Sequence, residues 1–146
     1  GAPYWDPDAR GAIFGLTRAT GPAELARAAL ESACYQTSDL IEAMAADGVH
    51  PVSLRVDGGM VANDWFLGFL ADMLGMPVER PRVMETTSLG AAYLAGRQAG
   101  VYGTPEEFAS LWQGDSLVEP RLTAGEREAL LRSWHDAVER TLPKRT

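Results

Sequence analysis

The sequence predicts an α/β domain, because strand-like and helix-like stretches alternate along it. Residues 52–56 alternate apolar and other side chains with the period of two that is typical of a strand. Two consecutive glycines, Gly58 and Gly59, follow this strand. Over residues 65–74, large apolar side chains then recur at helical spacing. A strand that runs through glycines into a helix is the arrangement at which open α/β sheets bind ligands.

The composition is that of one globular domain and excludes several classes of protein. The chain has 146 residues, 46% hydrophobic and 23% charged. A net charge of −7 without a Lys/Arg cluster argues against nucleic-acid binding. Since the sequence shows neither a membrane-length apolar run nor signal-peptide features, we expect no membrane insertion. The single cysteine, Cys34, excludes a disulfide framework and favours a cytoplasmic protein with a buried structural thiol. Metal-ligand spacing is absent, so no metal site is predicted in the chain itself.

The first half of the chain predicts a loop, a strand and a long helix. Residues 1–10 are rich in Gly, Pro and Asp, and Asp6 is expected to cap a turn there. Residues 11–17 predict a strand, and a helix is predicted from Pro22 to about Asp47, with proline at its first position. Its expected buried stripe is Leu25, Ala29, Leu40, Ile41 and Met44, whereas Glu31, Gln36 and Asp39 are either active-site groups or, as we favour, a solvated face.

The glycine pair has two interpretations that the residues alone leave open. In the first, the glycines make a tight turn, Asn63 is a simple N-cap, and Gly75 ends the helix. In the second, Gly58 and Gly59 let a ligand approach the backbone, where the helix N-terminus offers unpaired N–H groups. A glycine pair is a much weaker signal than a full dinucleotide-binding motif.

The second half predicts a short strand followed by three helices. The strand is expected over residues 77–80, and residues 85–88 are expected to cap a helix over residues 89–96. That helix is rich in Gly and Ala, and since each helical glycine costs about 1 kcal/mol against alanine, we expect close packing. The partner is either its own sheet or another domain. Capping boxes at Thr104/Glu107 and Thr123/Glu126 predict a short helix through Trp112 and a terminal helix through about Leu142, joined by an extended connector over residues 116–120.

One motif resembles a known protein family. Residues 11–16 read Gly-Ala-Ile-Phe-Gly-Leu, and Glu24-Leu25 and Ala28-Ala29-Leu30-Glu31 follow. This spacing resembles the second signature of the FGGY carbohydrate kinases. Residues 1–11 and 56–63 are most similar to the branch of that family that phosphorylates glycerol, and the similarity extends over nearly the whole chain.

The resemblance implies an actin-like, ribonuclease-H-like domain. Residues 1–146 would be part of the C-terminal, nucleotide-binding domain of a two-domain kinase, with the first strand or strands of that domain lying before Gly1. It further implies that ATP or ADP binds at Gly58 and Gly59, with Gly59 against the adenine and the Asn63 amide hydrogen-bonded to the nucleotide. Mg²⁺ would be held through ATP, and the helix at residues 89–96 would pack at an interdomain hinge.

The catalytic base, the phosphate loops and the glycerol-binding groups are expected upstream of Gly1. No catalytic residue is therefore predicted in this chain, and residues 1–146 alone are expected to be inactive. The full-length protein would transfer the ATP γ-phosphoryl group to glycerol, giving glycerol 3-phosphate, as a homodimer or homotetramer. Two alternatives remain open. One is another sugar kinase of the family, xylulokinase-like or gluconokinase-like, and the other is a non-catalytic nucleotide-binding module.

Overall fold

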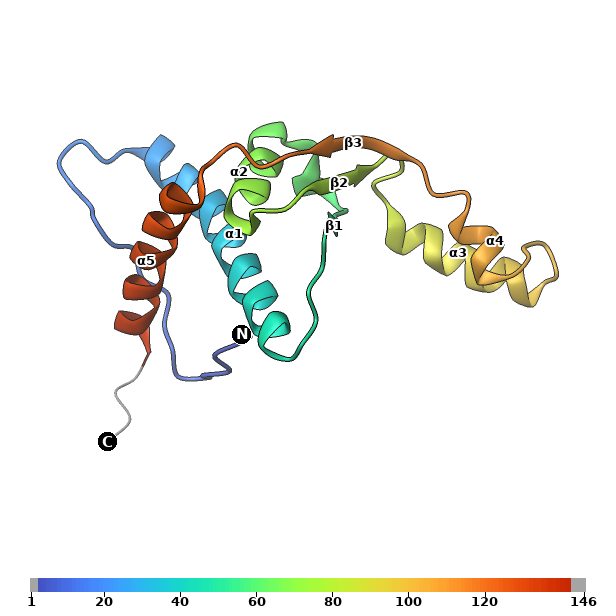
Figure 1. The fold of residues 1–146 in the computed structure, drawn as a ribbon, viewed down its shortest axis with the longest axis horizontal. Helices are drawn as coiled ribbons and strands as arrows, with labels where there is room; N and C mark the ends of the chain where they lie inside the picture. The colour runs from blue at the N-terminus through green and yellow to red at the C-terminus, as the bar shows by residue number, and fades with distance from the viewer. Residues whose placement is uncertain (1–2, 143–146) are drawn as a thin grey trace.

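A three-stranded sheet lies at the centre of the fold (Figure 1). The computed structural model of the chain describes residues 3–142. The strands are β1 (Leu54–Arg55), β2 (Val78–Pro81) and β3 (Gly114–Val118), in that spatial order. β1 runs parallel to β2, and β3 runs antiparallel to it. The predicted α/β class is confirmed.

Helix α2 (Asp64–Leu74) joins the sheet to the two long helices, α1 (Pro22–Ala46) and α5 (Ala124–Thr141). It contacts both long helices as well as β2 and β3. The expected helical spacing of apolar residues therefore builds the core, and Gly75 ends α2 with a left-handed φ of 64°, as predicted. The core comprises Cys34, Val61, Phe66, Leu67, Leu70, Ala71, Met73 and Val78.

Helix α1 begins and ends as predicted, but its predicted buried stripe is only partly covered, since Ile41 and Met44 are half-buried and Ala29 is exposed. Leu25 and Leu40, expected inside, are 41% and 44% exposed, whereas Cys34 and Asp39 are its buried residues. Spacing identifies an apolar stripe but not what covers it, and within residues 3–142 Leu25 and Leu40 stay exposed.

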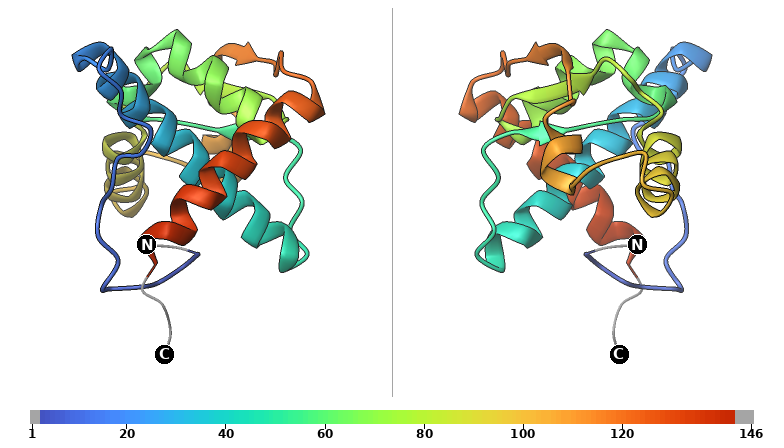
Figure 2. Two further views of the ribbon diagram at one scale, coloured as in Figure 1. Left: turned by 90° about the vertical axis from the view of Figure 1, so that its left-hand side faces the viewer. Right: turned by 90° about the vertical axis from the view of Figure 1, so that its right-hand side faces the viewer.

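Asp39 lies where α5 crosses α1 (Figure 2) and is only 4% exposed. Its carboxylate accepts hydrogen bonds from the Tyr4 hydroxyl (3.2 Å) and the Trp134 indole nitrogen (2.8 Å), and it is 3.0 Å from His135 Nε2. The expectation of a solvated face is therefore wrong for Asp39. It holds for Gln36, which is exposed, whereas the Glu31 side chain is only 22% exposed and pairs with Arg27.

Strand boundaries account for the other differences from expectation. Residues 11–17 do not form a strand, because their backbone has no ladder partner within the described chain. The strand expected over residues 52–56 is limited to Leu54–Arg55. Only residues 119–120 of the expected connector over residues 116–120 lie outside a strand, since Ser116, Leu117 and Val118 belong to β3 and pair with β2.

Helices α3 (Thr86–Gln98) and α4 (Pro105–Ala109) lie at the far end of the sheet from α1 and α5 (Figure 1). Stacked aromatic rings join them, since Tyr93 lies 4.2 Å from Phe108 between ring centroids. Gly96 is required there, because a Cβ would collide with the Tyr102 ring. α3 thus packs on its own small unit, and the predicted interdomain role of its remaining surface stays a prediction.

The ends of the helices in the second half follow the sequence with three exceptions. Helix α3, expected over residues 89–96, begins at Thr86 and ends at Gln98. Both capping boxes form, at Thr104 and at Thr123. The short helix ends at Ala109 rather than Trp112, and no side-chain hydrogen bond caps the start of α3.

Cys34 is expected to be chemically inert in the folded protein. Burial, with a smaller contribution from the charge of Glu31, raises the pKa of its thiol to about 12, so the reactive thiolate is scarce at neutral pH. We expect no reaction with Ellman's reagent in native buffer and complete reaction in denaturant, followed by absorbance. Rapid reaction of the native protein would contradict the buried placement.

Candidate functional site

The glycine turn connects β1 to α2 through a short 3₁₀ helix, η1 (Gly59–Ala62). Gly58, immediately before it, has a φ of 88°, in the region that favours glycine. Its N–H donates to the Met84 carbonyl at 3.1 Å. The conformational requirement for glycine in this turn therefore lies at Gly58.

Unlike Gly58, Gly59 is not required for its backbone conformation, but it leaves open space beside the chain. Its φ is not positive, and a Cβ added to it would meet no atom within 4 Å. The space beside its backbone is open to solvent, next to the half-exposed side chain of Met60. A flat ligand can therefore lie directly on this backbone, and a larger side chain would occupy the same space.

Asn63 caps helix α2 as predicted. Its Oδ1 accepts hydrogen bonds from the backbone N–H groups of Trp65 (3.0 Å) and Phe66 (3.2 Å). Among the described residues, its amide nitrogen Nδ2 donates to none. The two interpretations of Asn63 are therefore compatible, because the oxygen caps the helix while the nitrogen is available to a ligand.

Charged side chains surround the turn. Asp57 precedes the glycines and is exposed, and Asp64 is the first residue of α2. Arg80 on β2 pairs with Asp64 at 2.8 Å and with Asp115 on β3 at 2.9 Å. Hydrogen bonding to Asp64, followed by that to Asp115, raises the pKa of Arg80 and keeps it charged. Sequence reasoning missed Arg80, since nothing local distinguishes it from other strand residues.

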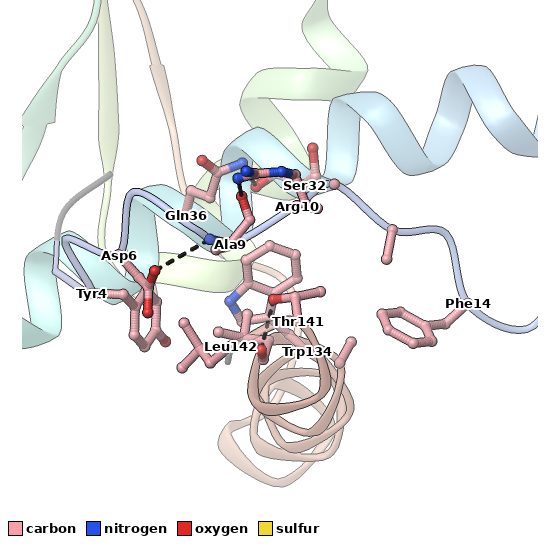
Figure 3. Close-up of a pocket in the computed structure, with 14 residues that line it drawn as sticks. Tyr4, Asp6, Ala9, Arg10, Phe14, Ser32, Gln36, Trp134, Thr141 and Leu142 are labelled. Carbon is pink, nitrogen blue, oxygen red and sulfur yellow. Dashed lines mark hydrogen bonds between the residues drawn. The ribbon is translucent and has the colours of Figure 1, made fainter. Parts of the chain in front are cut away.

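Two of the hollows among the described residues bear on the candidate site. A small one of about 270 Å³ adjoins the turn and is lined by Ala62, Arg80, Pro81, Arg82, Met84 and Asp115. A larger one of about 420 Å³ lies between residues 4–14, α1 and α5 (Figure 3). Asp6 borders the larger hollow and caps the loop there, as predicted, by accepting from the N–H groups of Asp8 and Ala9. None of Gly58, Gly59 and Asn63 lines either hollow.

Neither a metal centre nor a membrane segment is found in the part of the chain that the structure describes. Over residues 3–142, no three His, Cys, Asp or Glu side chains cluster so that they could hold a metal ion. Across the same residues, no helix is both long and apolar enough to cross a bilayer.

Comparison with protein families gives a direct assignment. Residues 1–99 match the model of the C-terminal domain of the FGGY family of carbohydrate kinases. The chain belongs to the FGGY family. The resemblance inferred from residues 11–31 is thereby confirmed.

Among curated proteins, this FGGY kinase chain is similar to bacterial glycerol kinases. It is 61% identical to that of Rhodospirillum centenum over 97% of its own length. It is 57% identical to that of Alteromonas mediterranea over 96% of its length. The chain spans 28% of the length of each of these relatives.

Solved structures of FGGY kinases share its fold. The glycerol kinase of Plasmodium falciparum, solved with ADP, has a TM-score of 0.82 and 33% identity over 99% of this chain and 29% of that one. A ligand-bound xylulose kinase of Lactobacillus acidophilus has a TM-score of 0.70 and 26% identity over 94% of this chain and 29% of that one. The fold class predicted from the sequence is thus that of FGGY kinases.

Proposed function

We propose that this chain is the nucleotide-binding part of a glycerol kinase, which transfers the γ-phosphoryl group of ATP to glycerol and yields glycerol 3-phosphate. The observation that carries this proposal is the identity of 57–61% to glycerol kinases over almost the whole chain. The xylulose and gluconate kinases of Lactobacillus acidophilus are only 26% identical to it. The branch that acts on glycerol is therefore favoured over the sugar-kinase alternatives.

The nucleotide is proposed to bind at the turn formed by Gly58, Gly59 and Asn63. The open backbone at Gly59 is suited to a flat base, and Nδ2 of Asn63 can donate to a nucleotide acceptor. The Plasmodium falciparum glycerol kinase, whose fold this chain shares over 99% of its length, was solved with ADP. A ligand site at the glycine turn also agrees with the general position of ligands in open α/β sheets.

The charges near the turn favour the base end of the nucleotide over its phosphates. Asp57 precedes the glycines and is exposed, and its carboxylate repels a polyphosphate, whereas the charge of Asp64 is paired with Arg80. Adenine is uncharged and is not subject to this repulsion. We therefore place the adenine at Gly59 and the phosphates away from the N-terminus of α2, with Mg²⁺ held through ATP. In phosphoryl transfer, the ion neutralises the charge that develops on the transferred group.

The remaining machinery is proposed to lie outside this chain. Phosphoryl transfer needs a base, donors for the phosphate oxygens and a place for glycerol. We assign none of these roles to residues 1–146. The contribution of this chain is to bind and orient the nucleotide, and assembly into homodimers or homotetramers stays a prediction.

The proposal is tested by substrate choice in the protein that carries this chain at the length of its relatives. ATP-dependent phosphorylation is measured with glycerol, xylulose and gluconate. We expect kcat/KM for glycerol to exceed that for either sugar substrate by about a hundredfold or more, since buried polar groups discriminate strongly between substrates. A higher value for xylulose or gluconate would favour a sugar kinase. ADP binding without turnover of any substrate would indicate a non-catalytic module.

Changing Asn63 is expected to separate its two roles. Asn63→Ser keeps a capping oxygen but lacks the amide nitrogen, so we expect an ATP KM raised about three- to tenfold with little loss of stability. Asn63→Ala removes both the oxygen and the nitrogen. We therefore expect the ATP KM to rise as in Asn63→Ser and the free energy of unfolding to fall by about 1 kcal/mol. Steady-state kinetics and denaturant unfolding provide the two readouts.

Thr123→Ala is the matched control, because it removes the side-chain cap of α5, far along the chain from the glycine turn. It should lower stability by about 1 kcal/mol and leave the ATP KM unchanged. If both Asn63 variants also keep the parental ATP KM, Asn63 is only a helix cap.

A further inference from the structure

We infer that Arg80 is a positioning residue for nucleotide binding, which holds the segment around Asn63 in the arrangement that the nucleotide recognises. The inference rests on the proposed nucleotide site. It extends that site to a residue on a different strand, and nothing in the local sequence around Arg80 indicates the role.

Arg80 contacts the chain on both sides of Asn63. Its Nη1 donates to the Val61 carbonyl at 3.2 Å, and the same nitrogen donates to Oδ1 of Asp64 at 2.8 Å. One acceptor thus lies two residues before Asn63 and the other one residue after it. The guanidinium therefore fixes the last turn of η1 relative to the first residue of α2.

The sheet in turn fixes Arg80. Its backbone lies in β2, where Arg80 pairs with Ser116 of β3. From β3, Oδ2 of Asp115 accepts a hydrogen bond from Nε at 2.9 Å. The Arg80 side chain is only 18% exposed. A planar guanidinium can bind these acceptors in separate directions, whereas a lysine ammonium offers one nitrogen at the end of a flexible chain.

The segment needs this support because its own hydrogen bonds are few. Within η1 and its cap, Val61 N donates to Gly58 O at 3.3 Å, and Asn63 N donates to Met60 O at 3.2 Å. Short 3₁₀ helices have poor hydrogen-bond geometry. A turn released by Arg80 would sample other conformations, and the nucleotide would then bind only the fraction that is correctly arranged. The buried side chain of Val61 still anchors the turn, so the fold itself is expected to survive.

The test compares Arg80→Met, Arg80→Lys and Arg55→Met in the protein that carries this chain at the length of its relatives. Arg55→Met is the matched control, since Arg55 lies on β1 and pairs with Glu79 without touching the turn. We expect Arg80→Met to raise the ATP KM and the Kd for ADP about five- to twentyfold, because hydrogen bonds to a charged group are lost. The KM for glycerol and kcat should stay within about twofold, Arg80→Lys should be intermediate, and Arg55→Met should match the parent.

An Arg80→Met protein that is folded and keeps the ATP KM of the parent overturns the inference. Gly59→Val then tells which claim has failed. If it raises the ATP KM, the nucleotide site stands without a role for Arg80, and if it does not, the proposed site itself is wrong. Should Arg80→Met fail to fold, Asp115→Ala decides, because it removes the acceptor of Nε and leaves the acceptors of Nη1 in place. An ATP KM raised about two- to fourfold in this variant supports the inference, and an unchanged value overturns it.

Discussion

Replacing Gly59 by valine is expected to raise the KM for ATP about tenfold or more and to leave the KM for glycerol unchanged. The added side chain would project into the open space beside the backbone, where we place the adenine. Stability should change little, because Gly59 does not have a positive φ and the new Cβ meets no atom within 4 Å. Steady-state kinetics and thermal unfolding of the full-length protein measure the two effects.

Gly59→Ala and Gly125→Val provide the controls. The smaller alanine should raise the ATP KM less than valine does. Gly125 is another glycine with open space around its Cα, but it lies in the first turn of α5. Gly125→Val should leave the ATP KM unchanged. An unaltered ATP KM in Gly59→Val would remove the nucleotide from the turn.

Replacing Asp39 by alanine is expected to lower the free energy of unfolding by about 2–4 kcal/mol. Tyr4, Trp134 and His135 would lose a common partner at once. The first of them lies in the N-terminal loop and the other two lie in α5, so the change loosens both from α1. Denaturant unfolding of the full-length protein measures the loss.

Two further substitutions of aspartates distinguish the loss of these hydrogen bonds from a general loss of charge. Asp39→Asn keeps an oxygen acceptor and should cost less than alanine. Asp136→Ala removes an exposed carboxylate of α5 that pairs with Arg140, and it should change stability by less than about 0.5 kcal/mol. If Asp39→Ala is no more harmful than Asp136→Ala, Asp39 does not hold the crossing of α1 and α5.

Features set by neighbouring residues could be predicted from the sequence. The ends of α2 follow from the Asn63 cap and from Gly75, and both capping boxes form as expected. Each depends on hydrogen bonds within one turn of the chain, which the residue types specify directly.

Features that depend on residues far away in the sequence could not be predicted. Residues 116–118 of the predicted connector belong to β3, because Ser116 pairs with Arg80 of β2, which lies 36 residues earlier in the chain. Asp39 looks like a surface residue of α1, and its partners Trp134 and His135 lie 95 and 96 residues away. Hydrophobic spacing identifies faces of a helix, but only the tertiary arrangement decides which face is covered.

The candidate site also contains both kinds of feature, some predictable from local sequence and one that depends on distant partners. Gly58 and Asn63 have local signals, a strand-to-helix turn and an N-cap, and the structure gives both a local role. Arg80 reaches Val61 from 19 residues away and Asp115 from 35. Its role depends on three elements meeting at one guanidinium, which no sequence pattern specifies.

A crystal structure of the full-length protein with ADP tests the central claim most directly. We predict that the adenine lies against the backbone of Gly59 and that Nδ2 of Asn63 donates a hydrogen bond to the nucleotide, while Arg80 keeps its bonds to Val61 and Asp64. The contrary result would be ADP bound elsewhere, for example in the hollow between residues 4–14 and α5, with Gly59 and Asn63 left exposed to solvent.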